Sequence, residues 1–124
     1  MKIIHTDQAP AAVGPYSQAV EANGMLYLSG QIAIDPKAGK IVATDIEGQA
    51  EQCCKNVEAI LAAAGQDMSA VVKTTCFLTN ISDFAKFNEV YAKHFISKPA
   101  RSCVAVKDIP AGALCEIEAL AAVK

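Results

Sequence analysis

Only two stretches of this sequence repeat apolar residues at the spacing of an α-helix, and each lies between stretches typical of β-strands. The first covers residues 45–64; it begins with the capping-box pattern Thr44-Asp45-Ile46-Glu47 and ends at Gly65. The second covers residues 83–95, with Ser82 as its expected N-cap. Because two helices cover only one face of a sheet, this pattern predicts a sheet whose other face carries no helix.

The expected strands are rich in β-branched or alternating apolar residues. Asn23-Gly24, the dipeptide favoured in a two-residue type I′ turn, joins the first two of them into a hairpin. These strands comprise residues 17–22, 25–32, 71–79, 101–107 and 114–123, with loops at 35–40 and 108–113. The predicted order βββαβαββ, which has one further strand before the first helix whose bounds the pattern does not define, belongs to the α+β class.

The last expected strand has apolar residues on both of its faces. Ile117 and Ala119 alternate with Leu114 and Leu120, which point the other way. An apolar face without a covering helix needs a partner, and closed symmetric assemblies of identical chains are the commonest way to provide one. We therefore expect a homo-oligomer.

Composition limits the classes of function. The chain has 124 residues, 52% of them hydrophobic, which suits one domain over residues 1–124 and excludes intrinsic disorder. A net charge of −2 argues against nucleic acid as the principal partner. The apolar stretches are too short to cross a bilayer, so we expect no membrane association and a cytoplasmic location. The five cysteines are odd in number and lack the spacing of a secreted disulfide scaffold, so we expect them to be reduced.

The usual motifs for cofactors and metals are absent from the sequence. It contains no GxGxxG motif, no Walker A loop and no HExxH motif. His5 and His94 are single and far apart in the sequence, and Cys53 and Cys54 are neighbours that point about 100° apart on a helix. We therefore expect neither a metal ion nor an organic cofactor.

Arg101 is the only arginine, and it stands at the start of an expected strand. The planar guanidinium suits bidentate capture of a carboxylate or phosphate; a surface ion pair is the equally weighted alternative. Cys103 follows on the same side of the strand, where the arginine could activate its thiol. A small strand residue without chemical activity is the favoured interpretation of Cys103.

Glu116 and Glu118 give the last strand an acidic face. One interpretation is a carboxylate near the arginine that orients or deprotonates water; a solvated face or a charged sheet edge is weighted equally. Tyr16 follows Gly14-Pro15, which would present its phenol, although packing in a half-buried position is favoured. Together these residues could bind a small carboxylate and move a proton.

Five blocks of sequence, in order over essentially the whole chain, resemble the RidA/YjgF family of reactive intermediate (enamine/imine) deaminases. The blocks are Gly14-Pro15-Tyr16-Ser17-Gln18-Ala19, Leu28-Ser29-Gly30-Gln31-Ile32, Val72-Lys73-Thr74-Thr75, Pro99-Ala100-Arg101-Ser102-Cys103-Val104 and Glu116-Ile117-Glu118-Ala119.

The resemblance implies a chorismate-mutase-like α+β fold, with two helices on one face of a mixed sheet, and a homotrimer with three clefts between subunits. It also implies a cofactor-free hydrolysis. The substrates would be 2-aminoacrylate/2-iminopropanoate and 2-aminocrotonate/2-iminobutanoate, which pyridoxal-phosphate dehydratases release. The products would be 2-keto acids and ammonia.

The resemblance also implies roles for individual residues. Arg101 would hold the substrate carboxylate, and Glu116 would position the attacking water. Further residues would line the cleft, some through backbone groups: Tyr16, Ser29, Gly30 and Cys103, with Asn88 as an additional candidate.

The segment 92–98 is shorter than the corresponding segment of many family members, and Lys98 stands where several members carry an aromatic or apolar residue. A lysine here could favour a second anionic group on the substrate.

The main alternative function is a non-catalytic or regulatory trimer that binds a keto acid or amino acid in the same cleft. Translation inhibition, RNA cleavage and a chaperone role are also associated with the family; RNA cleavage ranks low because no histidine pair or basic stripe is present.

Overall fold

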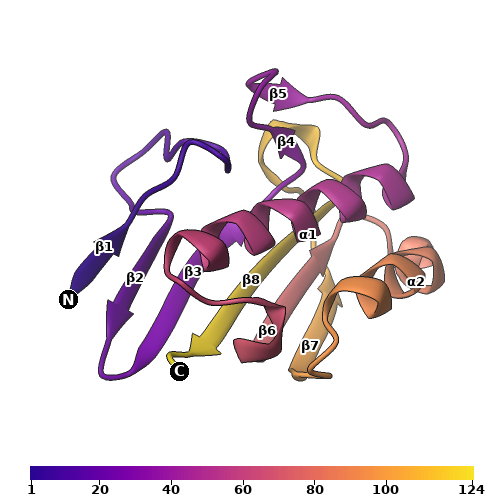
Figure 1. Ribbon diagram of the computed structural model, residues 1–124. Helices are drawn as coiled ribbons and strands as arrows, with labels where there is room; N and C mark the ends of the chain where they lie inside the picture. The colour runs from indigo at the N-terminus through magenta and orange to yellow at the C-terminus, as the bar shows by residue number, and fades with distance from the viewer.

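A computed structural model describes residues 1–124 and is built around a six-stranded sheet (Figure 1). The strands lie in the order β1-β2-β3-β8-β6-β7. Their bounds are β1 Lys2–Ile4, β2 Ala19–Ala22, β3 Met25–Gln31, β6 Val71–Leu78, β7 Ala100–Ala105 and β8 Cys115–Ala122. Strands β6 and β7 run parallel and the other neighbouring pairs are antiparallel, so the sheet is mixed, as the resemblance implies.

Strands β2 and β3 form the expected hairpin. Asn23 and Gly24 have φ angles of 53° and 76°, which is the left-handed pair that a type I′ turn requires. A second, small hairpin lies where a plain loop is predicted: β4 (Ile34–Asp35) pairs with β5 (Lys40–Ile41). The sequence pattern misses it because two residues in each strand are too few to show alternation.

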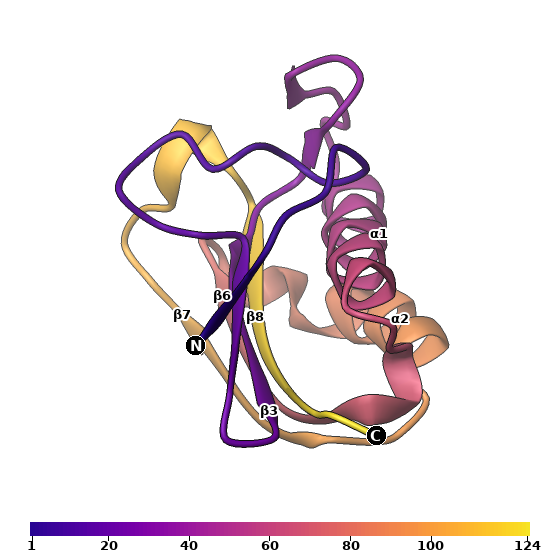
Figure 2. The same cartoon turned by 60° about the vertical axis from the view of Figure 1, so that its left-hand side comes forward.

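The two helices, α1 (Ile46–Ala63) and α2 (Phe84–His94), pack on one face of the sheet, and the other face carries no α-helix (Figure 2). The expected C-terminal stop of α1 is confirmed. Gly65 has a φ of 76°, and the N–H of Gln66 donates to the carbonyl of Leu61, which is the pattern of a Schellman motif. Neither helix is long and apolar enough to span a membrane.

Both helices begin differently from the expectation. Asp45, and not Thr44, caps α1, because its carboxylate accepts a backbone N–H of the first turn at 2.8 Å. The expected N-cap Ser82 is wrong for α2. Ser82 lies inside the short 3-10 helix η2 (Ile81–Asp83), and Asn80 caps that turn by accepting the backbone N–H of Ser82 at 3.0 Å.

Strand β8 lies between β3 and β6, and its alternation separates the two faces of the sheet. Cys115, Ile117, Ala119 and Ala121 are buried under the helices. On the bare face, Glu116, Glu118 and Leu120 are half-buried, and Tyr27 and Val104 are exposed. This face therefore carries both acidic and apolar side chains.

Candidate active site

Arg101 extends from the edge strand β7 toward α2. In the β6–β7 register it lies beside the buried Thr74, so its side chain is on the face that the helices cover. Nη1 of Arg101 donates a 2.7 Å hydrogen bond to Oδ1 of Asn88, and Cζ lies 4.8 Å from the centre of the Tyr91 ring. Because Asn88 and Tyr91 are three residues apart, they share a face of α2 and hold the guanidinium together.

No carboxylate neutralises Arg101 within the chain. All close charged contacts between basic and acidic side chains involve His5 or His94. The alternative of a surface ion pair for Arg101 is therefore excluded within the chain. Because the guanidinium has five N–H donors and only one makes a side-chain hydrogen bond, donors remain for an anion.

A cavity of about 530 Å³ opens beside Arg101, and we call it the arginine pocket. Its lining residues are Asn88, Tyr91, Ala92, Phe95, Ile96, Lys98, Pro99 and Arg101. The rings of Tyr91 and Phe95 are stacked 4.3 Å apart, and the hydroxyl of Tyr91 is fixed by a 2.7 Å hydrogen bond to Thr74. Two cations, apolar walls and no acid make this a pocket suited to a small organic anion.

Glu116 lies on the opposite face of the sheet. Its neighbours Cys115 and Ile117 are fully buried under the helices, so its own side chain points to the bare face. Burial raises the pKa of Glu116, and the nearby charge of Glu118 raises it further. A carboxylate with a raised pKa is a stronger base than a free one, which suits it to take a proton from water.

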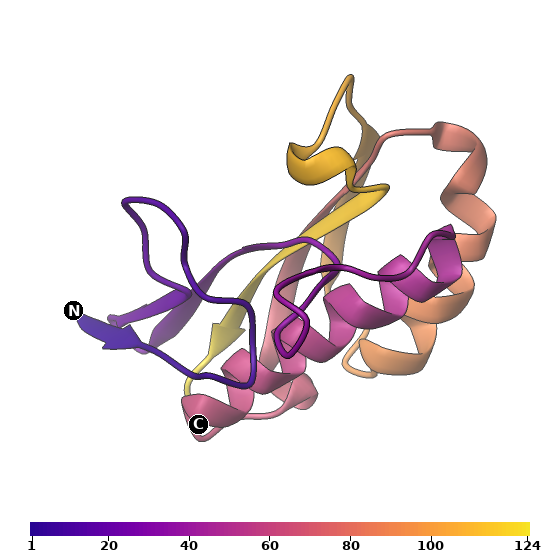
Figure 3. The same ribbon diagram turned by 90° about the horizontal axis from the view of Figure 1, so that it is seen from above.

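Glu116 is part of a second cavity, of about 470 Å³, which we call the carboxylate pocket. The residues that line it include Pro10, Val13, Tyr16, Gln18, Ser29, Gly30, Pro110, Glu116 and Glu118. Part of the N-terminal loop, residues 5–18, and the short helix η3 (Pro110–Gly112) rise on the side of the sheet away from the helices (Figure 3). These two segments form the rim of the carboxylate pocket.

Gly30 makes room for the side chain of Glu116. A Cβ atom at Gly30 would lie 2.9 Å from Cδ of Glu116, so any larger residue would displace the Glu116 carboxyl group from this position. Ser29 uses its hydroxyl to hold the N-terminal loop, donating a 2.6 Å hydrogen bond to the carbonyl of Ser17. Tyr16 lies at the rim of this pocket with 51% of its surface exposed, so about half of the residue is open to solvent in the single chain.

Cys103 lines neither pocket. It lies on the helix side of β7 next to Cys76, half-buried against the core. Burial raises the pKa of Cys103, against the smaller opposing effect of Arg101, so the thiol form is favoured. This agrees with the interpretation of Cys103 as a small strand residue.

One chain therefore divides the expected site residues between two pockets on opposite faces. Arg101 and Asn88 are in the arginine pocket, whereas Tyr16, Ser29, Gly30 and Glu116 are in the carboxylate pocket. Tyr91 is not among the site residues expected from the sequence, although its position three residues after Asn88 on a helix is a usable signal.

The fold and these pockets define a class of protein: a small α+β chain with an unpaired arginine in one pocket and a carboxyl group of raised pKa in another. The chain matches the family described as Endoribonuclease L-PSP over residues 6–123, and it belongs to that family, which is also the family of the RidA/YjgF proteins.

Relatives in this family carry different names. The chain is 54% identical to a Lactococcus lactis protein named putative regulator AldR, over 100% of this chain and 99% of that one. It is 46% identical to the mouse protein named 2-iminobutanoate/2-iminopropanoate deaminase, over 97% of this chain and 90% of that one. The structure of E. coli TdcF with bound serine superposes with a TM-score of 0.94 at 43% identity, over 100% of both chains.

Proposed function

We propose that this protein hydrolyses small 2-imino acids, which are tautomers of 2-enamino acids, to 2-keto acids and ammonia. The observation that carries the proposal is the unpaired Arg101 in a pocket with apolar walls, oriented by Asn88. The name of the mouse relative supports the reaction, and the serine bound to TdcF supports a small carboxylate ligand.

In the proposed reaction, Arg101 holds the substrate carboxylate and orients the imine carbon, which is already electrophilic. Glu116 removes a proton from water as the water oxygen bonds to that carbon, and this proton passes on to the imine nitrogen, which returns Glu116 to its ionised form. Transfer of the hydroxyl proton to nitrogen then breaks the carbon–nitrogen bond. Ammonia leaves, the carbon becomes a carbonyl, and the overall change is the addition of one water and the loss of one ammonia.

We place the complete site between subunits of a homotrimer. Arg101 and Glu116 lie on opposite faces of one sheet, so the arginine pocket of one subunit would meet the carboxylate pocket of the next. The edge position of β7 leaves the arginine pocket at the rim of the molecule, where a neighbour has access. Tyr27, Leu120 and Val104 on the bare face supply apolar contact area.

The first experiment couples a serine/threonine dehydratase to an assay of keto-acid release. We expect the wild-type protein to accelerate release and Arg101→Ala to lower kcat/KM about thirtyfold or more, because removing one partner of a buried charge pair costs about 2–5 kcal/mol. Arg101→Lys should also be severely impaired, since an ammonium lacks the planar fork. Lys40→Ala, a change in β5 at a residue that lines neither pocket, is the matched control. Near-normal kcat/KM in both Arg101 variants would refute the proposal.

The second experiment tests the site between subunits. Arg101→Ala and Glu116→Gln chains, each inactive alone, are unfolded together and refolded as mixed trimers. A site shared by two chains regains both intact residues in about a quarter of cases at equal mixing, whereas a site within one chain regains none. Light scattering on the same samples checks the mass of the trimer.

A regulatory role is the second candidate, and the name of the 54% identical AldR favours it. In that role the arginine pocket would bind a keto acid or amino acid without turnover. Binding of 2-ketobutyrate by the wild-type protein, with no acceleration of imine hydrolysis, would support the regulatory role over the enzymatic one.

RNA cleavage ranks below both, because His5 and His94 each lie beside carboxylates of their own and form no pair. RNase activity that disappears in Arg101→Ala would reverse that ranking.

A further inference from the structure

Gln18 is a buried polar residue immediately before β2, with 3% of its surface exposed. Its Oε1 accepts the backbone N–H of Thr6 at 2.8 Å. Its Nε2 donates to the carbonyl of Thr6 at 3.0 Å and to the carbonyl of Pro10 at 2.9 Å, with a longer contact of 3.4 Å to the carbonyl of Ala9. One side chain thus binds three successive points of the N-terminal loop.

These hydrogen bonds replace strand pairing where the sheet ends. The β1–β2 ladder stops at the pair Ile4 and Ala19. Gln18 is the next residue along, and its amide binds both backbone groups of Thr6, as another strand would. Every hydrogen bond that reaches residues 6–10 from elsewhere in the chain comes from Gln18. Without this amide the segment would keep no hydrogen bond to the sheet.

The segment that Gln18 holds forms a wall of the carboxylate pocket. Pro10, which the Gln18 amide binds directly, lines the same cavity as Glu116, and Val13 and Tyr16 line it farther along the same loop. Strand β3 forms the floor of this pocket through Ser29 and Gly30. The backbone of Gln18 is bonded to this floor as well, because its carbonyl accepts the N–H of Ser29 at 2.9 Å. Gln18 therefore sets the separation between the wall and the floor.

We propose that Gln18 is a positioning residue: its amide fixes the loop that continues to Tyr16 and lines the same pocket as Glu116, and this sets the rate of the chemical step. The proposal rests on the proposed hydrolysis of imines. Binding of the substrate carboxylate depends on Arg101 in the other pocket, so Gln18 should act on kcat and leave KM nearly unchanged.

The test is Gln18→Glu, which keeps the shape of the side chain. An ionised carboxylate would face the carbonyls of Thr6 and Pro10 and repel them, whereas the protonated carboxyl donates one hydrogen bond and still accepts one from Thr6. We expect kcat at pH 8 to fall about tenfold to a hundredfold, the range for small misplacements of reacting groups. The ratio of variant to wild-type kcat should then rise as the pH falls.

Gln49→Glu is the matched control. Gln49 is also a buried glutamine that binds backbone at both ends of its amide, to Ala43 and Leu114, but it lines neither pocket. It should lose thermal stability to a similar extent and keep its kcat. Equal losses of kcat in both variants would overturn the positioning role, because they would show a general effect of weakened folding.

Hydrogen exchange gives a readout that does not require activity. Backbone amides of residues 6–17 should exchange faster in Gln18→Glu than in the wild-type trimer, while those of β8 stay protected. Unchanged exchange in residues 6–17 would overturn the proposal. If the wild-type protein does not hydrolyse imines, the proposed function fails, and the exchange measurement alone decides whether Gln18 holds the wall.

Discussion

Asn88 holds Arg101 by a single 2.7 Å hydrogen bond from the guanidinium to an amide oxygen. The partner is neutral, so it orients the cation without cancelling its charge. A carboxylate at the same position would orient the guanidinium equally well and would compete with any anionic ligand. The choice of an amide therefore keeps the arginine pocket available to an anion.

Substitutions of Asn88 should separate orientation from charge. We expect Asn88→Ala to lower kcat/KM about tenfold to a hundredfold, since a hydrogen bond to a charged group contributes about 1.5–3 kcal/mol. Asn88→Asp should be worse, because the new carboxylate pairs with Arg101. Calorimetric titration with 2-ketobutyrate checks this; tighter binding by the Asp variant than by the Ala variant would contradict it.

Gly30→Ala should lower activity while the fold is kept. The added methyl group would displace the carboxylate of Glu116 from its place in the pocket. We expect at least a tenfold lower kcat/KM, of the size seen when reacting groups are misplaced. The double variant Gly30→Ala, Glu116→Gln should be no worse than Glu116→Gln alone. Additive losses would show that Gly30 acts through another group.

The acid limb of the pH profile should depend on Glu118. The proposed base is the ionised form of Glu116, so activity is lost as the pH falls through its pKa. Burial raises that pKa most and Glu118 adds to it; Glu118→Gln removes the second contribution and lowers the pKa. The limb of kcat/KM should therefore move to lower pH. A limb that does not move would show that another group sets it.

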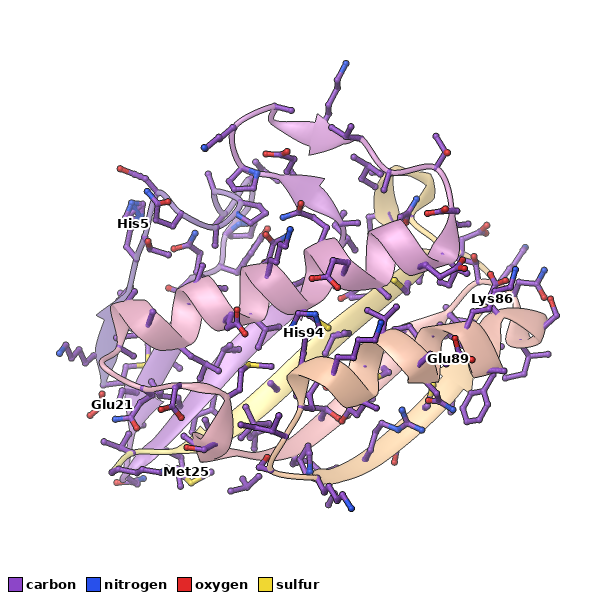
Figure 4. The ribbon with its side chains drawn as sticks, turned by 45° about the vertical axis from the view of Figure 1, so that its right-hand side comes forward. His5, Glu21, Met25, Lys86, Glu89 and His94 are labelled. Atoms are coloured by element: carbon purple, nitrogen blue, oxygen red, sulfur yellow. The ribbon has the colours of Figure 1, made fainter.

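His94 should matter for stability and not for catalysis. It lies between the two helices (Figure 4), with Nε2 2.9 Å from a carboxylate oxygen of Glu51 on α1, and it lines neither pocket. We expect His94→Ala to lower the free energy of unfolding by about 1 kcal/mol in urea titrations, with kcat unchanged. Glu58→Gln is the control, because its contact with His94 is 3.8 Å long and half-exposed, and its effect should be near zero.

Lys98 should affect the choice of substrate. It lines the arginine pocket beside Arg101 and is the second cation there. Lys98→Ala should lower kcat/KM more for an imine derived from a dicarboxylic amino acid than for 2-iminobutanoate. An equal change for both substrates would show that Lys98 makes no contact with a second carboxylate.

Much of the fold could be predicted because its signals are local. The Asn23-Gly24 turn, the stop at Gly65 and the alternation of β8 each depend on a few adjacent residues. The helix starts were less predictable because several capping residues stand side by side. Thr44 and Asp45 compete at α1, and only the geometry of the preceding chain decides between them.

The candidate site was predictable residue by residue but not in its arrangement. Arg101 and Glu116 stand out by residue type and position in the sequence. Their separation depends on the register of β6 with β7 and with β8, which are pairings between distant segments. The neutral anchor at Asn88 and the role of Gln18 likewise depend on contacts that adjacent residues do not encode.

The division of the proposed site between two faces also makes the reaction sensitive to substitutions at the surface of the chain. In a monomeric enzyme, an exposed residue far from the pocket is free to vary. Here, under the proposed assembly, each face of the sheet would supply half of a reaction centre to a different neighbour. We expect the chain to tolerate few substitutions on either surface, and a new binding partner for the bare face could be gained only by giving up the reaction.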